Sequence, residues 1–313
     1  MAKKMSSTRL AAGEALRDLA LQGKDVVGIS ADTSKSMYTT LIREVCPERF
    51  IDLGIAEQNM VMVAAGLAST GKIPYVASYS VFTSMRCCEQ LRTFAAYPGL
   101  NVKVIAGIGG LSAGIEGVTH VATEDLGIVR CIANMAVVAP SDYITTHKAV
   151  MAAADYQGPV YIRVGRDSTP ELFDGTYDFV IGKPVMHRQG KEITLIGCGL
   201  IMAEVLEAAR MLASQGIEAE VIEMHTLKPV LDPEMIFNSA KKTGRVITVE
   251  EHNIIGGLGT VVSEILCGRM LVKMKKLGLP DCFGESGTPE ELVRKFGLDA
   301  ENIVKESREI LAA

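Results

Sequence analysis

Apolar and polar residues divide the chain into short runs rich in β-branched residues and longer segments with helical spacing. The short runs predict strands. They are almost continuously apolar, which is typical of strands in a parallel sheet that helices cover on both faces. Before residue 167 they lie at 25–32, 48–55, 73–79, 102–108, 135–142 and 159–166. This alternation predicts an α/β fold with a doubly wound, mainly parallel sheet.

A stretch at residues 167–191 interrupts the alternation with three glycines, two prolines and mixed polar residues. A second alternation follows, with expected strands at 192–199, 219–227 and 245–252, helices over 201–215 and from about Leu258, and two short helices within 289–313. We therefore predict a first domain at residues 1–175, a linker at 176–191 and a smaller α/β domain at 192–313.

Charge and composition exclude several classes of protein. The chain of 313 residues carries 32 Lys and Arg against 37 Asp and Glu, a formal net charge of -5, so we expect neither a nucleic-acid nor an anionic-lipid partner. The longest uncharged stretch runs only from Gln58 to Gly71, shorter than the roughly 18 apolar residues that a membrane helix needs. We expect a soluble protein with no association with membranes.

The cysteines and the first residues bear on the compartment. The 7 cysteines form no C-x-x-C pair, which favours reduced thiols, and MAKKMSSTRL has no apolar run after its lysines. We therefore expect a cytoplasmic protein without a signal peptide. The 5 histidines lack the spacing of metal ligands, so we predict no metal held by this chain alone.

The segment most informative about chemistry is GIAEQN at residues 54–59, followed by VMVAAGLASTGK. It places Glu57 at the start of a helix that is apolar or small on every side, which predicts a helix buried on all faces. A buried carboxyl needs a hydrogen-bonding partner, because an unpaired buried charge is very costly. Free helix N–H groups could supply it. A ligand is the other alternative.

Three motifs resemble one family. GIAEQN, SYSVF at residues 78–82 and the segment from Glu116 to His120 are similar to the transketolase family of thiamine diphosphate enzymes, over the pyrimidine-binding and C-terminal domains. 1-Deoxyxylulose-5-phosphate synthases share this half. The family's metal-binding and diphosphate-binding pattern, G-D-G with a downstream Asn, is absent from the chain. The resemblance therefore implies one subunit of a split transketolase.

The resemblance implies roles for three residues toward thiamine diphosphate, and position in the predicted sheet adds a fourth. The acid that matches Glu57 hydrogen-bonds the ring nitrogen of the cofactor's aminopyrimidine in this family, and so promotes loss of the proton from carbon 2 of the thiazolium. Phe82 matches the aromatic residue on which the aminopyrimidine stacks, and Tyr79 matches a second aromatic residue. Asp32 follows the first strand, where parallel sheets place ligands. By their local sequence alone, Tyr79 and Phe82 could be core residues and Asp32 a turn residue.

The resemblance also implies substrate contacts. His120 matches a histidine near the donor sugar's carbonyl, which makes it a second catalytic candidate, and Glu116 stands where the family usually has Asp. The positions that contact phosphate map onto Arg9, Ser36 and Arg166, with Arg163 as a neighbour. For each arginine the alternative is a surface or interdomain salt bridge. Full-length transketolases have His just after the strand segment that matches VKVIA at residues 102–106, and deoxyxylulose phosphate synthases have Arg. Here Ile108, Gly109 and Gly110 follow, so part of the phosphate contact is missing.

The implied function is ketol transfer from a ketose or its phosphate to an aldose or its phosphate. An N-terminal-half partner subunit would bind Mg²⁺ or Ca²⁺ and the diphosphate, and homodimerisation would give an α2β2 assembly. One alternative is the β-type subunit of a 2-oxo acid dehydrogenase E1 component, against which GIAEQN argues. The others are a 1-deoxyxylulose-5-phosphate synthase-like enzyme and a non-catalytic transketolase-like scaffold.

Overall fold

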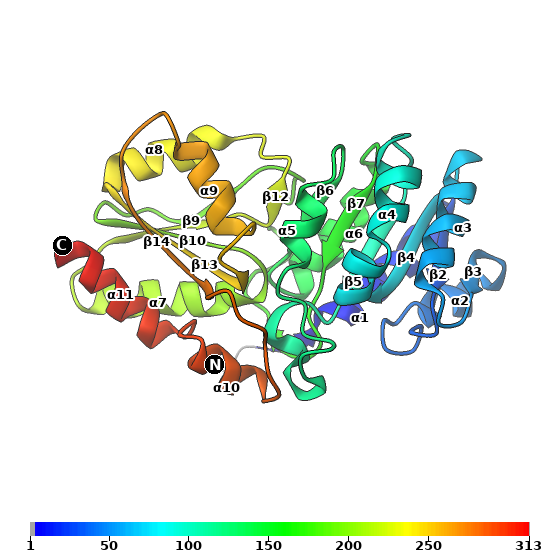
Figure 1. Cartoon of the computed structure of the whole chain (residues 1–313), viewed down its shortest axis with the longest axis horizontal. Coiled ribbons are helices and arrows are strands. Elements are labelled where there is room, and N and C mark those ends of the chain that lie inside the picture. Colours follow the sequence, from blue (N-terminus) through cyan, green and yellow to red (C-terminus); the bar gives the residue numbers. More distant parts are fainter. Residues whose placement is uncertain (1–3, 313) are drawn as a thin grey trace.

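Two sheets lie side by side along the long axis of the molecule in the computed structural model, which describes residues 4–312 (Figure 1). The first sheet has seven strands in the order β12-β6-β7-β5-β4-β2-β3, all parallel to their neighbours except β12. Its strands are β2 (Val26–Ser30), β3 (Phe50–Asp52), β4 (Ile73–Tyr79), β5 (Lys103–Gly107), β6 (Ala136–Val138), β7 (Val160–Arg163) and β12 (Thr226–Lys228). The expected doubly wound parallel sheet is confirmed.

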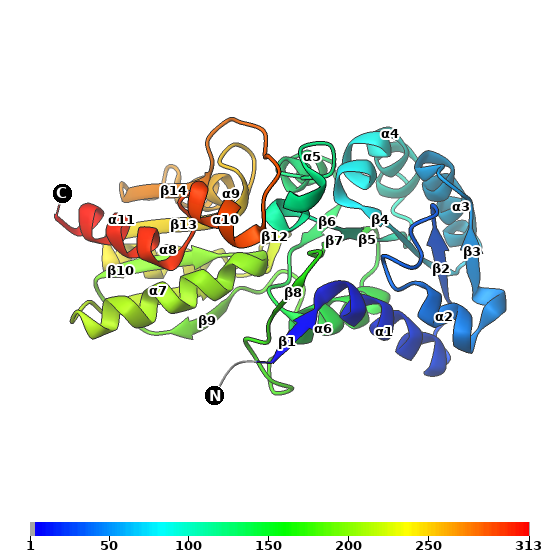
Figure 2. The same ribbon diagram turned by 90° about the horizontal axis from the view of Figure 1, so that it is seen from below.

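Helices cover both faces of this sheet. On one face lie α1 (Thr8–Leu21), α2 (Thr40–Val45) and α6 (Tyr143–Asp155), and on the other α3 (Glu57–Ser69), α4 (Cys88–Gln90) and α5 (Asp125–Arg130) (Figure 2). Every residue of β2, β5 and β7 is buried, as continuous apolar runs predict for strands between two helical layers.

The second, smaller sheet has the order β14-β13-β10-β11-β9. Its strands are β9 (Val185–Arg188), β10 (Ile193–Gly197), β11 (Ala219–Glu223), β13 (Arg245–Asn253) and β14 (Lys273–Leu279). Its helices are α7 (Met202–Ser214), α8 (Pro233–Thr243), α9 (Leu258–Leu266), α10 (Pro289–Lys295) and α11 (Ala300–Ala312). The expected smaller α/β unit is confirmed.

The expected strand at 219–227 is wrong in its extent, because the chain passes there from one sheet to the other. β11 ends at Glu223, and after His225 the chain enters β12, which pairs antiparallel with β6 at the edge of the first sheet. One hydrophobic core continues across this crossing, from Val137 through Met224 to Val246.

The stretch at 167–191 also contains two short strands. β8 (Ser168–Pro170) pairs with β1 (Met5–Ser7), and β9 adds an antiparallel edge to the second sheet. The glycines and prolines of this stretch predict where elements end, but they do not predict these two strands. These pairs depend on partners far away in the sequence.

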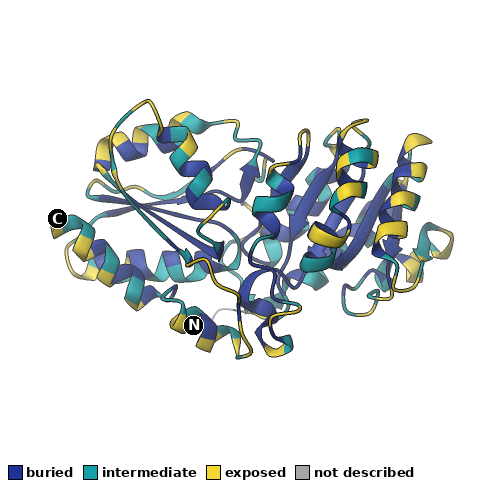
Figure 3. Cartoon of the chain, viewed as in Figure 1, coloured by how far each residue is buried: buried dark blue, intermediate teal, exposed yellow. Residues whose placement is uncertain are grey.

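The expectation that the helix at Glu57 is buried on all faces is wrong for this chain by itself. α3 packs one face on the sheet through Met60, Val61 and Ala64, whereas Asn59 and Met62 on the other side are exposed (Figure 3). Apart from Gln58 and Asn59 near the start of the helix, the exposed residues of α3 are also small or apolar, so composition alone does not separate the packed face from the outer one.

No helix within residues 4–312 is long and apolar enough to cross a membrane. The expectation about a signal peptide rests partly on residues 1–3, which lie outside the described residues.

Candidate functional site

The carboxyl ends of five parallel strands bring most of the expected site residues to one edge of the first sheet. These neighbouring strands are β7, β5, β4, β2 and β3. Arg166 follows β7, Phe82 follows β4, Ser36 follows β2 and Glu57 follows β3. Ligands of open α/β sheets bind at this edge, because the loops after parallel strands meet there.

Glu57 is the first residue of α3 and only 3% exposed. Gly54, with a φ of +68°, turns the chain between β3 and this helix, a conformation that suits glycine. The carboxylate accepts a hydrogen bond from Nη1 of Arg86 at 2.8 Å, which is also an ion pair. The partner that burial required is therefore a side chain rather than the helix N–H groups.

Sequence reasoning did not identify Arg86. It ends a π-helical turn over Phe82–Arg86, and its guanidinium carbon lies 4.2 Å from the centroid of the Phe82 ring. The sequence did contain one signal for the contact of Arg86 with Phe82. The two residues are four positions apart, and residues with this spacing in a helical segment lie on the same face. Arg86 thus joins the acid and the aromatic residue that the family resemblance assigns to one cofactor ring.

Three rings form one cluster beside this pair, which we call the ring cluster: Tyr79, Phe82 and His120. The Phe82 and Tyr79 centroids are 6.0 Å apart in a stacked arrangement, and the His120 ring lies edge-on to both, at 5.4 Å from Phe82 and 5.7 Å from Tyr79. Thr119 Oγ1 lies 2.9 Å from Nδ1 of His120, within hydrogen-bonding distance. The cluster offers an aromatic surface with an imidazole at its rim.

Arg9 and Ser36 continue the site from Tyr79. The Tyr79 hydroxyl lies 3.3 Å from Ser36 Oγ, which accepts a hydrogen bond from Arg9 Nη1 at 2.7 Å. Nη1 also donates to the Ser36 carbonyl, and Nε and Nη2 both donate to the carbonyl of Arg166. Burial lowers the pKa of Arg9, and the positive charge of Arg166 adds to this effect. Three nitrogens of the guanidinium thus already have protein acceptors.

Glu116 faces the second arginine of this region. Its Oε1 lies 3.2 Å from Nε of Arg166, and its Oε2 is buried without a hydrogen-bond partner among residues 4–312. An unpaired buried oxygen is costly, so it favours a donor group from outside the chain. A second carboxylate oxygen, Oδ1 of Asp167, lies 4.0 Å from Nη1 of Arg166.

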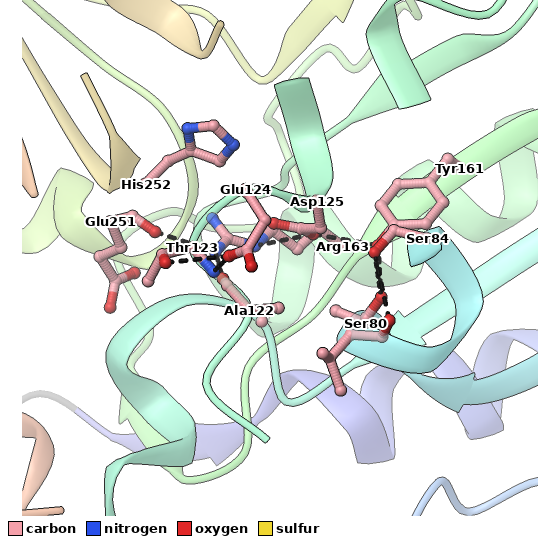
Figure 4. A network of polar contacts seen from close by, with 12 residues as sticks. Ser80, Ser84, Ala122, Thr123, Glu124, Asp125, Tyr161, Arg163, Glu251 and His252 are labelled. Carbon is pink, nitrogen blue, oxygen red and sulfur yellow. Dashed lines mark hydrogen bonds and ion pairs between the residues drawn. The ribbon is translucent and has the colours of Figure 1, made fainter. Parts of the chain in front are cut away.

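Arg163 lies apart from this group, in the junction between the two sheets. It is 7% exposed, with Nη2 donating to the carbonyls of Ala122 and Glu251 and Nε lying 3.3 Å from Asp125 (Figure 4). Burial by itself lowers the pKa of Arg163. The negative charges of Asp125 and Glu251 raise it by more, so the pKa is raised overall. These contacts correspond to the interdomain salt bridge rather than to a phosphate ligand, so our proposed site leaves Arg163 out.

The same arginine accounts for the glycines after β5. A Cβ on Gly109 would lie 2.4 Å from Nε of Arg163, and one on Gly110 would lie 2.9 Å from the Glu251 Cβ. Ile108 has a φ of +60°, a strained conformation for a β-branched residue. The chain therefore passes Arg163 closely and has no room for a cationic side chain at Gly109 or Gly110.

Asp32 is at the same edge of the sheet but exposed, with a φ of +59°. Its backbone N–H donates to Oδ1 of Asp52 at 3.0 Å, and Asp52 also accepts from Gly54. Within the described residues this is a turn, and a cofactor contact from Asp32 stays a prediction.

The part of the chain that the structure describes contains no group of three or more His, Cys, Asp or Glu side chains placed to hold a metal. The seven cysteines are free. Burial, with a smaller effect of the charge on Glu57, raises the pKa of Cys87 to about 12, so this thiol stays protonated.

Comparison with known proteins identifies the family of both domains. Residues 4–171 match the transketolase pyrimidine-binding domain, and residues 182–303 match the transketolase C-terminal domain. A putative transketolase C-terminal section from Methanocaldococcus jannaschii is 42% identical over 94% of this chain and 92% of its own. A 6-deoxy-6-sulfo-D-fructose transketolase subunit from Clostridium sp. is 40% identical over 94% of this chain and 91% of its own.

Among solved structures, an inactive β4 tetramer of a split-gene transketolase superposes with a TM-score of 0.90, at 42% identity over 98% of each chain. These three matches each cover more than nine tenths of both chains. The chain therefore belongs to the transketolase family, in which it corresponds to the part that contains the pyrimidine-binding and C-terminal domains.

Proposed function

We propose that the chain is the C-terminal-half subunit of a thiamine diphosphate-dependent transketolase and acts with a separate N-terminal-half subunit. The assembly transfers a two-carbon ketol unit from a ketose or its phosphate to an aldose or its phosphate. The observation that carries this proposal is the buried carboxylate of Glu57 beside Phe82, linked to it through Arg86.

The residues at this position fit the aminopyrimidine of thiamine diphosphate. Glu57 supplies a buried carboxyl for a ring nitrogen, and Phe82 and Tyr79 supply an aromatic surface for stacking. When bound, the cofactor supplies the nucleophilic carbon and the electron sink for breaking a carbon–carbon bond. The buried setting of Glu57 favours the hydrogen bond, since water does not compete for the carboxyl.

His120 acts on the sugar in this proposal. It lies at the edge of the ring cluster, where its imidazole can donate a hydrogen bond to the sugar's carbonyl oxygen as negative charge develops there. Glu116 Oε2, buried and without a partner among the described residues, can accept a hydrogen bond from a sugar hydroxyl. The two side chains come from the same short segment and together orient one substrate.

A partner subunit would complete the site. The chain lacks the family's G-D-G pattern, so we assign Mg²⁺ or Ca²⁺ and the cofactor diphosphate to the partner. Exposed apolar side chains offer a contact surface on and beside α3 and the two helical turns packed against it, Phe82–Arg86 and Leu91–Ala96: Ile55, Met62, Met85, Phe94 and Tyr97. We propose that this surface is covered in an α2β2 assembly.

Free cysteines support a reducing compartment, and we place the enzyme in the cytoplasm.

An assay with the partner present tests this function. We expect ketol transfer between pentose phosphates and no decarboxylation of pyruvate. Decarboxylation with acyl transfer to lipoamide would instead support the 2-oxo acid dehydrogenase alternative, and condensation of pyruvate with glyceraldehyde 3-phosphate would support the deoxyxylulose phosphate synthase alternative. An assembled complex inactive in all three assays would support a scaffold.

Glu116 pairs with Arg166 and so competes with a substrate phosphate for its guanidinium. We expect Glu116→Gln to raise kcat/KM for D-ribose 5-phosphate relative to D-ribose by about tenfold, since it removes a negative charge 3.2 Å from that guanidinium. Parallel initial-rate measurements with both acceptors test this. The control is Glu124→Gln, which changes a carboxylate of the same length whose Oε2 accepts from Thr123. An unchanged ratio would show that Arg166 does not hold the phosphate.

A further inference from the structure

Arg86 contacts both groups that the proposed function assigns to the aminopyrimidine. Its Nη1 donates to Glu57 at 2.8 Å, and its guanidinium lies over the Phe82 ring at 4.2 Å. The guanidinium is planar and cationic, and it engages a carboxylate and an aromatic face at the same time, as a stacked nitrogen heterocycle would. The inference below rests on the proposed function.

The two partners of Glu57 require different forms of the carboxyl. A guanidinium pairs with the charged carboxylate, whereas an uncharged ring nitrogen accepts a hydrogen bond from the protonated acid. A Glu57 oxygen that is held by Arg86 is therefore not available to share a proton with a heterocycle. Occupancy of this acid by the cofactor implies that the arginine contact is lost.

We propose that Arg86 is a placeholder in the cofactor-free chain: it neutralises Glu57 and covers Phe82, and binding of the aminopyrimidine displaces its side chain from both.

The local structure permits this exchange. The Arg86 side chain is 45% exposed, so its guanidinium can turn into solvent at little desolvation cost, whereas Glu57 at 4% side-chain exposure cannot. The Arg86 backbone stays anchored, because Gln58 Nε2 donates to its carbonyl at 3.1 Å. The motion is thus one of the side chain alone, on a turn that is held in place by its buried residues Thr83 and Ser84.

The placeholder lowers the affinity for cofactor, because its contacts must break first. In Arg86→Met these contacts are lost and Glu57 is left buried without a cation, so the cofactor-free state becomes less stable and the cofactor binds more tightly. We expect the dissociation constant of thiamine diphosphate to fall about tenfold. Arg86→Gln should change it in the same direction.

The experiment is a calorimetric titration of thiamine diphosphate with saturating Mg²⁺ into the complex of this chain with its partner subunit. A matched control exists in the second domain. Arg269 pairs with Glu234 at 2.7 Å and lies 3.8 Å over the Phe237 ring, the same combination of carboxylate and aromatic face. Arg269→Met should leave the dissociation constant within about twofold of wild type.

Thermal unfolding of the same samples gives a second readout. Arg86→Met should lower the melting temperature without cofactor and match wild type at saturating cofactor, because only the cofactor-free state contains the contact. Affinity that is unchanged or weaker in Arg86→Met would overturn the inference, and weaker affinity would mean that Arg86 stays and holds the cofactor. If the wild-type complex itself shows no binding of thiamine diphosphate, the proposed function fails and this inference fails with it.

Discussion

Ketol transfer should fall by about a thousandfold or more when Glu57 is replaced by alanine, while the chain still assembles with its partner. The substitution removes the buried carboxyl that is the proposed partner of the aminopyrimidine nitrogen. Proton transfer by a positioned side chain contributes about 10²- to 10⁴-fold to a rate. The fold should tolerate the change, because the other member of the ion pair, Arg86, is 45% exposed and returns to solvent.

Turnover is measured with saturating cofactor and substrates, and assembly by size-exclusion chromatography with light scattering. Glu57→Gln separates the proton from the shape of the side chain, and it should be nearly as inactive because an amide cannot share a proton in this way. Glu301→Ala is the control, since this exposed residue lies in α11 of the second domain. Turnover by Glu57→Ala within about tenfold of wild type would remove Glu57 from the mechanism.

Replacing Arg163 with methionine should reduce the free energy of unfolding by about 3–5 kcal/mol. The guanidinium joins the two sheets, bonding to a carbonyl before α5 at Ala122 and to one on β13 at Glu251. Its loss leaves the carboxylate of Asp125, itself 0% exposed, without its cation. A buried charge without a partner costs far more than the pair contributed.

Chemical denaturation followed by circular dichroism measures this effect. Adding Asp125→Asn to Arg163→Met should recover part of the loss, because it removes the uncompensated charge. Arg188→Met is the control, because Arg188 pairs with the part-exposed Glu218 and should cost less than about 1 kcal/mol. A loss below about 1 kcal/mol for Arg163→Met would show that the junction does not depend on this side chain.

Arg163 and Arg86 illustrate where inference from the sequence ends. Arg163 lies three residues before Arg166 and has the same side chain, yet one is buried between the sheets and the other lies at the site edge. Alternation along a strand and its following loop does not say which arginine will be buried between the two sheets and which will lie at the site. Arg86 and its partner Glu57 are 29 residues apart in the sequence, so no local pattern joins them.

The sequence by itself determined the α/β class, the strands of the first sheet except β12, three of the five strands of the second sheet, the position of Glu57 at a helix start and the family. Hydrophobic runs and helix-start residues are local properties, so they can be recognised without coordinates. The tertiary structure alone decided that β12 crosses to the first sheet, that α3 keeps an outer face and that Arg86 holds Glu57. Each of these depends on which distant groups come within hydrogen-bonding or packing distance, and that proximity exists only once the strands have been assembled into sheets.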